Sequence, residues 1–257
     1  MMVTMRPRVR PAGGEFRATL RRSLHLFNEF RYEQPDPARF YTALAEDSAA
    51  QVASYTELDG RLVLDVGGGP GYFRRAFQAR GARYLALDAD AGELAGAGEI
   101  EEGTVLGSGM ELPFRDGCID VCYSSNVLEH VPDPWRMADE MLRVVRPGGL
   151  VFLSYTVWFG PWGGHETAPW HYLGGMRARR RYRRRHGHEP KNRFGESLFP
   201  VTVRDGLAWA RRQRLVDGVD VVDLAPRYHP RWARWVLRVP VLREVVTWNL
   251  VIVLRRR

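Results

Sequence analysis

A run of glycines follows directly after a short apolar segment near the end of the first quarter of the chain. Asp65 ends the apolar segment, and glycines occupy positions 67, 68, 69 and 71. Glycine lets the backbone turn sharply and approach a ligand closely, and a helix after such a turn directs its N–H groups at that ligand. The pattern therefore predicts a ligand site built from Asp65, Gly67, Gly68, Gly69 and Gly71.

This turn differs from a dinucleotide-binding turn, which has the pattern G-x-G-x-x-G. The third glycine comes one residue early, and Tyr72 stands where the dinucleotide glycine would be. A second acid, Asp88, follows about 20 residues after the glycines, at the end of the next apolar segment. An acid at this place can accept hydrogen bonds from both hydroxyls of a ribose. Asp88 could also be a helix cap, but its distance from the glycine turn favours the ribose role.

The elements that must position these residues alternate between strand and helix along the chain. This alternation predicts an α/β fold with a doubly wound, mostly parallel sheet and a helical N-terminal cover. Helices are predicted at 17–32, 37–58, 72–80, 134–145 and 203–214, and strands at 61–66, 83–89, 103–108, 118–125, 150–158, 219–228 and 249–257.

Three further motifs follow the glycine turn in order: SGMELPF at 108–114, SSNVLEHV at 124–131 and LRVVRPGG at 142–149. Over about residues 37–155, the four motifs together resemble the class I S-adenosylmethionine-dependent methyltransferases, and among them the bacterial small-molecule and lipid group called methyltransferase type 11. The resemblance implies a Rossmann-like sheet of seven strands with the last one antiparallel. It also implies S-adenosylmethionine as the cofactor.

The resemblance assigns a part of the cofactor to each motif. It implies that the glycine turn holds the methionine moiety with help from Asp65, and that Asp88, followed by Ala89, holds the ribose. Ser108, Gly109 and Met110 would flank the adenine, and Asn126 would close the site near the methionine end. The family usually has an acid where Ser108 stands. This departure bears on the affinity for the cofactor and not on its identity.

Residues 159–199 interrupt the alternation, and we interpret them as an acceptor-binding insertion within a single domain of residues 17–257. Residues 1–16 are expected to be a disordered tail. Insertions after the fifth strand of such a sheet lie at its carboxyl edge, where ligands bind. The insertion contains Trp170 and Tyr172, which could form walls for the acceptor, although a plain polar loop is the alternative.

The same insertion contains candidates for acid–base chemistry. Transfer of a methyl group to a hydroxyl requires removal of a proton. His165 or His171 could be the base, with Glu166 as its orienting partner. Their spacing matches no helix-borne zinc motif, so no metal is expected. His130 is a further candidate, but its position beside a family motif favours a structural role.

The formal net charge is +8, and seven of the nine residues from 177 to 185 are arginines. Such a charge favours anionic partners, which could be phosphorylated molecules, a phospholipid surface or RNA. RNA is disfavoured because only Tyr182 interleaves with the arginines and no RNA-binding module accompanies them. The expected acceptor is a hydroxyl or carboxylate on a small or lipid-linked molecule, with a glycan among the candidates. The alternatives are an RNA methyltransferase and a catalytically silent S-adenosylmethionine-binding partner protein.

The sequence shows neither a secretory signal nor an apolar run long enough to cross a membrane, so a cytoplasmic protein is expected. Residues 231–243 read as a helix with Trp232, Trp235, Val236 and Val239 on one face and arginines beside it. This pattern suits peripheral association with the inner face of the cell membrane. The alternative is that the same face packs on the sheet. The oligomeric state is left open.

Overall fold

The structure, a computed structural model, describes residues 16–33, 35–94, 102–215 and 218–257. The tail predicted for residues 1–16 falls outside this range except for Phe16.

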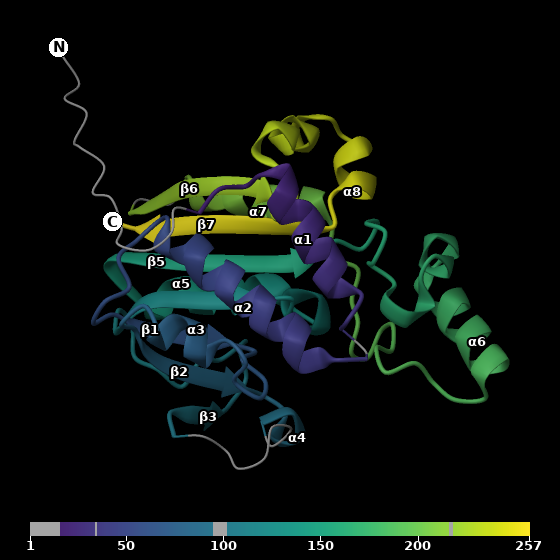
Figure 1. The fold of residues 1–257 in the computed structure, drawn as a ribbon, viewed down its shortest axis with the longest axis horizontal. Helices are drawn as coiled ribbons and strands as arrows, with labels where there is room; N and C mark the ends of the chain where they lie inside the picture. The colour runs from purple at the N-terminus through teal and green to yellow at the C-terminus, as the bar shows by residue number, and fades with distance from the viewer. Residues whose placement is uncertain (1–15, 34, 95–101, 216–217) are drawn as a thin grey trace.

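One sheet organises the chain, with its strands in the order β3-β2-β1-β4-β5-β7-β6 (Figure 1). Strand β7 runs antiparallel to both of its neighbours, and the other strand pairs are parallel. This confirms the predicted Rossmann-like sheet with an antiparallel last strand. The strands are β1 (Leu62–Val66), β2 (Arg83–Asp88), β3 (Thr104–Leu106), β4 (Ile119–Ser125), β5 (Val145–Thr156), β6 (Val219–Pro226) and β7 (Asn249–Arg256).

Helices cover both faces of the sheet, and each face has its own apolar core. Strand β1 shows why: Val63 belongs to one core, while Leu64 and Val66 belong to the other. Successive side chains of a strand point to opposite faces, so strands covered on both faces must be apolar throughout. The helices of the first face are α1 (Leu20–Phe30), α2 (Pro37–Ala53) and α3 (Arg74–Gln78), those of the second are α5 (Pro134–Val144) and α7 (Val203–Gln213), and α4 (Ala91–Leu94) follows β2.

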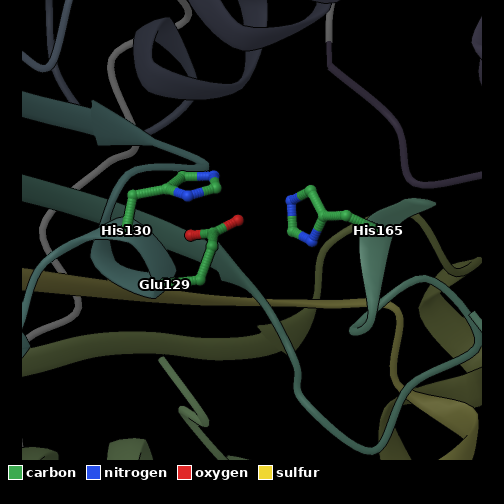
Figure 2. Close-up of side chains that lie close together, drawn as sticks. All are labelled: Glu129, His130 and His165. Atoms are coloured by element: carbon green, nitrogen blue, oxygen red, sulfur yellow. The ribbon is translucent and has the colours of Figure 1, made fainter. Parts of the chain in front are cut away.

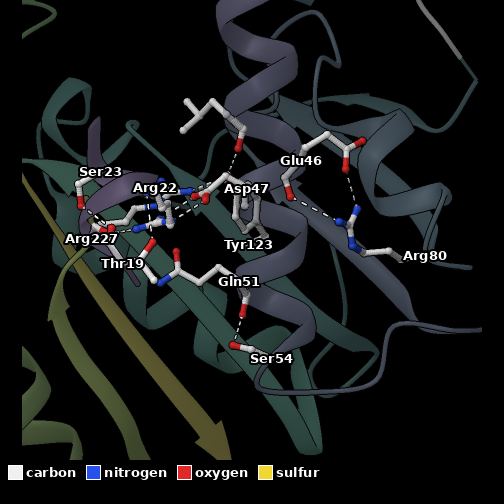
Figure 3. A network of polar contacts seen from close by, with 12 residues as sticks. Thr19, Arg22, Ser23, Glu46, Asp47, Gln51, Ser54, Arg80, Tyr123 and Arg227 are labelled. Atoms are coloured by element: carbon white, nitrogen blue, oxygen red, sulfur yellow. Dashed lines mark hydrogen bonds and ion pairs between the residues drawn. The ribbon is translucent and has the colours of Figure 1, made fainter. Parts of the chain in front are cut away.

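The N-terminal cover is held to the sheet by a polar network (Figure 3). Arg22 of α1 forms a two-bond ion pair with Asp47 of α2, at 2.5 and 2.6 Å, and donates to the backbone oxygen of Arg227 at 2.9 Å. The Arg227 guanidinium is buried and donates to the hydroxyls of Ser48, Ser125 and Ser154 at 2.6 to 2.7 Å. Ser125 is the last residue of β4, and Ser154 lies near the end of β5. The network therefore connects the cover to the carboxyl edge of the sheet.

The segment 159–199 lies at this carboxyl edge, and its last helix projects from the body of the protein (Figure 1). It forms two short 3-10 helices, η2 (His165–Thr167) and η3 (Trp170–Leu173), and the helix α6 (Gly175–His186). The arginine run is therefore helical, which suits the high helix propensity of arginine. The left-handed conformation of Gly187, with φ of +77°, ends the helix.

Residues 231–238 form the 3-10 helix η4 (Arg231–Arg238) instead of the predicted α-helix, and α8 (Leu242–Val246) follows. A 3-10 helix has three residues per turn, so residues three apart lie above one another. Trp232 and Trp235 are accordingly both exposed, while Val236 is buried, which splits the predicted apolar face. Among the described residues, no helix combines the length and the hydropathy needed to cross a bilayer.

Candidate functional site

The glycine turn lies where β1 ends and is fixed to the neighbouring strand β2. The backbone N–H groups of Gly67 and Gly68 both donate to the carbonyl oxygen of Leu87, with N–O distances of 2.7 and 3.2 Å. Gly67 has a φ of +80°, and a Cβ atom there would lie 2.3 Å from Cγ2 of Val127. Only glycine fits this position, because the turn packs directly against the segment that follows β4.

Asp88 connects the end of β2 to the glycine turn. Its Oδ2 atom accepts the backbone N–H of Gly69 at 3.0 Å, and its Oδ1 atom accepts the N–H of Asp90, also at 3.0 Å. A carboxylate oxygen has two lone pairs, so each oxygen can accept one more hydrogen bond from a ligand. Ala89 is exposed beside this carboxylate.

The segment 108–110 approaches the same edge from β3. The N–H of Gly107 donates to the carbonyl oxygen of Asp88 at 2.9 Å, and the Ser108 hydroxyl accepts the N–H of Met110 at 3.2 Å. A Cβ atom at Gly109 would lie 3.0 Å from Cγ1 of Val66. The three cofactor motifs predicted from the sequence therefore converge on the carboxyl ends of β1 and β2.

The side chain of Asp65 is buried beneath the glycine turn, next to Gly68. This side chain is 2% exposed and accepts a hydrogen bond from the Tyr84 hydroxyl. A Cβ atom at Gly68 would lie 3.4 Å from the Asp65 carboxyl carbon. Burial raises the pKa of this carboxyl to about 7, although the Tyr84 hydrogen bond acts in the opposite direction. The predicted orienting effect of Asp65 on the methionine moiety would therefore act through the backbone of the turn.

Asn126 lies at the exit of β4 with a φ of +56°, which is uncommon outside glycine. Its N–H donates to the carbonyl oxygen of Ser154 at 2.9 Å, and its side-chain oxygen accepts the amide of Asn249 at 2.7 Å. Asn126 thus joins the end of β4 to β5 and β7.

The three catalytic candidates of the insertion have different surroundings. Glu166 accepts a hydrogen bond from the side chain of Asn192 at 2.9 Å, and its role as the orienting partner of a histidine stays a prediction. His171 is 1% exposed and packs between Trp158 and Tyr172, so it belongs to the interior of the insertion. Its burial lowers its pKa.

The two predicted acceptor walls also have partners of their own. Trp170 lies under the guanidinium of Arg181, which is 3.8 Å from the ring centre, and the Tyr172 hydroxyl donates to the carbonyl oxygen of Phe159 at 3.2 Å. Trp170 and Leu173 line an open pocket of about 600 Å³ together with five arginines of α6: Arg177, Arg180, Arg181, Arg183 and Arg184.

His165 instead meets two residues of the motif after β4 (Figure 2). One potential ligand atom from each of Glu129, His130 and His165 lies within 4.8 Å of the other two. The rings of His130 and His165 are 5.1 Å apart between centres. From the sequence, Glu129 had no predicted role, and His130 was a further candidate for which a structural role was favoured. The adjacent acid and imidazole directly after a strand were the signal that could have identified them.

Each member of this cluster is held by the backbone around it. The Oε1 atom of Glu129 accepts the N–H of Thr156 at 2.9 Å, while its Oε2 atom is buried without a hydrogen-bond partner among the described residues. Nδ1 of His130 lies 2.7 Å from the carbonyl oxygen of Ser197. His165 has a φ of +47°, and burial together with the nearby His130 lowers its pKa to about 4. The cluster thus combines one buried carboxylate with two imidazole rings.

Known proteins are similar to this chain in sequence and in fold. A family described as a methyltransferase domain matches residues 64–153. An uncharacterized methyltransferase of Mycobacterium sp. (strain KMS) is 57% identical over 247 residues, which is 93% of this chain and 96% of the relative. A second one, of Mycobacteroides abscessus, is 54% identical over 94% of this chain and 96% of its own length.

Solved structures share the fold at lower identity. An S-adenosylmethionine-dependent methyltransferase from Mesorhizobium loti has a TM-score of 0.55 and 23% identity, covering 82% of this chain and 98% of its own. Geranyl diphosphate C-methyltransferase from Streptomyces coelicolor, solved with Mg²⁺, geranyl diphosphate and S-adenosylhomocysteine, has a TM-score of 0.53 and 14% identity, covering 85% and 80% of the two chains. The chain belongs to the methyltransferase family, whose methyl donor is S-adenosylmethionine.

Proposed function

We propose that this methyltransferase transfers the methyl group of S-adenosylmethionine to a hydroxyl or carboxylate oxygen of a lipid-linked or small anionic acceptor. The observation that carries the proposal is the cluster of Glu129, His130 and His165. Glu129 and His130 follow Asn126 on the segment whose Val127 packs against the glycine turn, and His165 of segment 159–199 lies beside them. Groups that can activate an oxygen therefore lie next to the place where the methyl donor is expected.

The carboxyl edge of β1 and β2 fits the methyl donor. A Cβ atom at Gly69 would meet no atom within 4 Å, so the turn faces open space in which a ligand can lie. Asp88 and the turn would hold the ribose and the methionine moiety there, as the family resemblance implies. S-adenosylmethionine supplies a methyl group on a positively charged sulfur, and the main task of the protein is to bring the acceptor in line with it.

The cluster fits an oxygen acceptor. A hydroxyl must lose its proton before or during methyl transfer, and a carboxylate must be held with its lone pairs toward the methyl group. The lowered pKa of His165 leaves its ring neutral at physiological pH, with a lone pair available on one nitrogen. This retains His165 from the sequence prediction and gives it Glu129 and His130 as neighbours in place of Glu166 and His171.

Helix α6 favours an anionic acceptor. It packs on η2 and η3, so its arginines begin next to the segment that contains His165. Arg180, Arg181 and Arg184 are exposed and line the open pocket beside Trp170. Arginine binds phosphate and carboxylate groups with two parallel hydrogen bonds, and the indole adds an apolar wall. A phosphate-bearing or acidic molecule fits this surface better than a neutral one.

The exposed tryptophans of η4 favour an acceptor at a membrane. Trp232 is 69% exposed and Trp235 is 49% exposed, with the exposed Arg231 and Arg238 on the same short helix. Indoles lie well at the level of lipid headgroups, and guanidinium groups meet lipid phosphates there. We propose that the protein docks peripherally on an anionic membrane surface and meets a lipid-linked acceptor there.

The test is a transfer assay with methyl-labelled S-adenosylmethionine and mycobacterial extract separated into lipids, polar small molecules and RNA. We expect label in the lipid or small-molecule fraction. Mild alkali then separates methyl esters, which release the label, from methyl ethers, which keep it. The Asp88→Ala variant is the control for enzyme-dependent transfer. Label in RNA would support an RNA methyltransferase instead, and no transfer to any fraction would support a silent binding protein.

A further inference from the structure

We infer that Glu129, His130 and His165 form a binding site for a divalent first-row transition-metal cation. Two imidazoles and one carboxylate make up a ligand set typical of Zn²⁺, Fe²⁺ and Co²⁺, and it leaves coordination positions open for other ligands. Glu129 and His130 come from the segment after β4, and His165 comes from the insertion. The site therefore joins two segments that are far apart in the sequence (Figure 2).

The spacing of the ligand atoms suits one ion. The three atoms lie within 4.8 Å of one another. A metal at about 2.0–2.2 Å from each ligand brings such atoms to roughly 3–3.5 Å from one another. The side chains would therefore close by about 1 Å or a little more around the ion, which rotation about their terminal bonds allows.

The hydrogen bonds of His130 leave the correct nitrogen free. A carbonyl oxygen can only accept a hydrogen bond, so the contact of Nδ1 with the Ser197 oxygen at 2.7 Å requires the proton on Nδ1. In the neutral ring, which is the form that binds a metal, the other nitrogen, Nε2, then has a free lone pair. Metal-binding histidines are commonly fixed in this way, with one nitrogen donating to a backbone carbonyl and the other on the metal.

Glu129 provides the second, independent observation. Its side chain is 1% exposed, and its Oε1 atom is fixed by the N–H of Thr156. Its Oε2 atom is buried and has no hydrogen-bond partner within the described part of the chain. A buried carboxylate oxygen without a partner is costly, since it has lost its water and gained nothing in return. A bound cation would supply the missing partner and the compensating charge.

The backbone at His165 is strained in a way that serves this arrangement. A φ of +47° is unfavourable for a residue with a Cβ atom and persists only where the surrounding structure holds it. The preceding Gly163 and Gly164 are closely packed, since a Cβ atom at Gly163 would lie 2.0 Å from the Trp158 oxygen and one at Gly164 would lie 2.5 Å from the His171 ring. The packed turn thus holds the His165 ring beside Glu129 and His130.

The consequence for the reaction rests on the proposed function. A cation at this place would bind the acceptor oxygen and lower the pKa of a hydroxyl there. His165 would then be a metal ligand instead of the base, so the oxygen–hydrogen bond would break with its proton passing to solvent and its electron pair staying on oxygen. That pair then forms the oxygen–methyl bond, while the electrons of the methyl–sulfur bond stay on sulfur. No oxidant or reductant is needed.

The test uses the full chain, freed of metal with a chelator and titrated with Co²⁺. Co²⁺ bound by imidazole and carboxylate absorbs visible light, so binding is seen without any activity assay. We expect one equivalent to bind. Glu129→Gln and His165→Asn should weaken binding by about 100-fold or more. Glutamine can still accept the Thr156 N–H, and asparagine tolerates a positive φ, so both variants should fold. The matched control is His188→Gln, because His188 is exposed and lies outside the cluster.

Absence of the visible bands, or equal binding by the control and the two cluster variants, would overturn the inference. The labelled-transfer assay separates this result from the proposed function. Oxygen methylation that persists in metal-free protein without Co²⁺ binding would refute the metal site alone. A metal bound at the cluster together with label only in RNA would refute the proposed acceptor and leave the metal site standing.

Discussion

The Oδ2 atom of Asp88 lies 3.0 Å from the backbone nitrogen of Gly69 and accepts its hydrogen bond. One carboxylate therefore shapes the glycine turn and also offers lone pairs to the ligand that the turn would hold. Because the other oxygen is fixed by Asp90, the carboxylate cannot rotate freely before the ligand arrives. The carboxylate that we propose for the ribose is thus preorganised, which would reduce the entropic cost of binding.

The first prediction concerns this carboxylate. Asp88→Ala removes two acceptors for the ribose hydroxyls and releases the N–H of Gly69, so S-adenosylmethionine should bind more weakly by roughly 2–4 kcal/mol. Calorimetric titration measures the change. The control is Asp90→Ala, since the Asp90 side chain is exposed and, among the described residues, accepts the local N–H of Gly92 alone. Equal affinities of wild type and Asp88→Ala would refute the ribose assignment.

A second prediction compares two glycines of the turn. Gly67→Ala should be severely destabilising, because its new Cβ would lie 2.3 Å from Val127 and its φ is +80°. Gly69→Ala should cost only the backbone strain of roughly 1–2 kcal/mol, because its new Cβ would meet no atom within 4 Å. Urea unfolding of both variants checks this order. Gly69→Ala should nevertheless lose cofactor affinity, because its methyl group enters the open space assigned to the ligand.

Most strands of the sheet could be predicted from the sequence, because strand ends and glycine turns depend on residues that are close together in the chain. Asp65 and Asp88 lie near the ends of β1 and β2, and Gly67 directly follows β1, as the local sequence predicted. The cluster of Glu129 and His165 could not be predicted in this way, since it depends on how the insertion folds back over β4 and β5. The same is true of Glu166, whose partner Asn192 comes from beyond α6. Pairings between distant segments are set by packing and leave no periodic signal in the sequence.

The pH dependence of stability tests the burial of Asp65. Its pKa is about 7 in the folded protein, against an ordinary value of 3.8. Because the folded state holds the proton more tightly, the stabilising contribution is complete below about pH 4 and is lost as the pH rises toward 7. The difference corresponds to about 4 kcal/mol.

The third prediction follows from that sign. Asp65→Asn keeps an acceptor for the Tyr84 hydroxyl but cannot ionise, so it should gain stability relative to wild type as the pH rises from 4 to 8. Urea unfolding of the cofactor-free protein at several pH values measures this difference, in which the titration of all other groups cancels. A difference that stays constant across the range would show that the carboxyl is not buried as described.

The fourth prediction contrasts two neighbouring acids of α2 (Figure 3). Asp47 pairs with Arg22, and both side chains are largely buried, at 12% and 10% exposed. Asp47→Ala leaves that arginine buried without its partner and should destabilise the protein by about 3 kcal/mol, with faster hydrogen exchange in α1. Glu46 is 56% exposed and pairs with Arg80, so Glu46→Ala should cost less than about 1 kcal/mol. Equal losses in the two variants would contradict the role assigned to the buried pair.

The fifth prediction concerns docking on a membrane. Trp232 and Trp235 lie above one another on η4 and are 69% and 49% exposed, so about half or more of each side chain faces solvent. We expect wild-type protein to sediment with vesicles that contain anionic lipid, to bind less as salt is added, and to stay in solution with neutral vesicles. The Trp232→Ala, Trp235→Ala double variant should bind anionic vesicles several-fold less while it still unfolds cooperatively, as a folded protein does.

The control for this experiment is Leu106→Ala. Leu106 is also an exposed apolar residue, at 62%, but it lies on β3 at the opposite edge of the sheet from β6 and η4. A loss of binding in this variant equal to that of the tryptophan variant would indicate a nonspecific hydrophobic effect. Wild-type protein that remains in the supernatant with anionic vesicles at low salt would exclude η4 as a membrane-binding element. In that case the acceptor would have to reach the arginines of α6 from solution, and the labelled-transfer assay should show label in the small-molecule fraction alone.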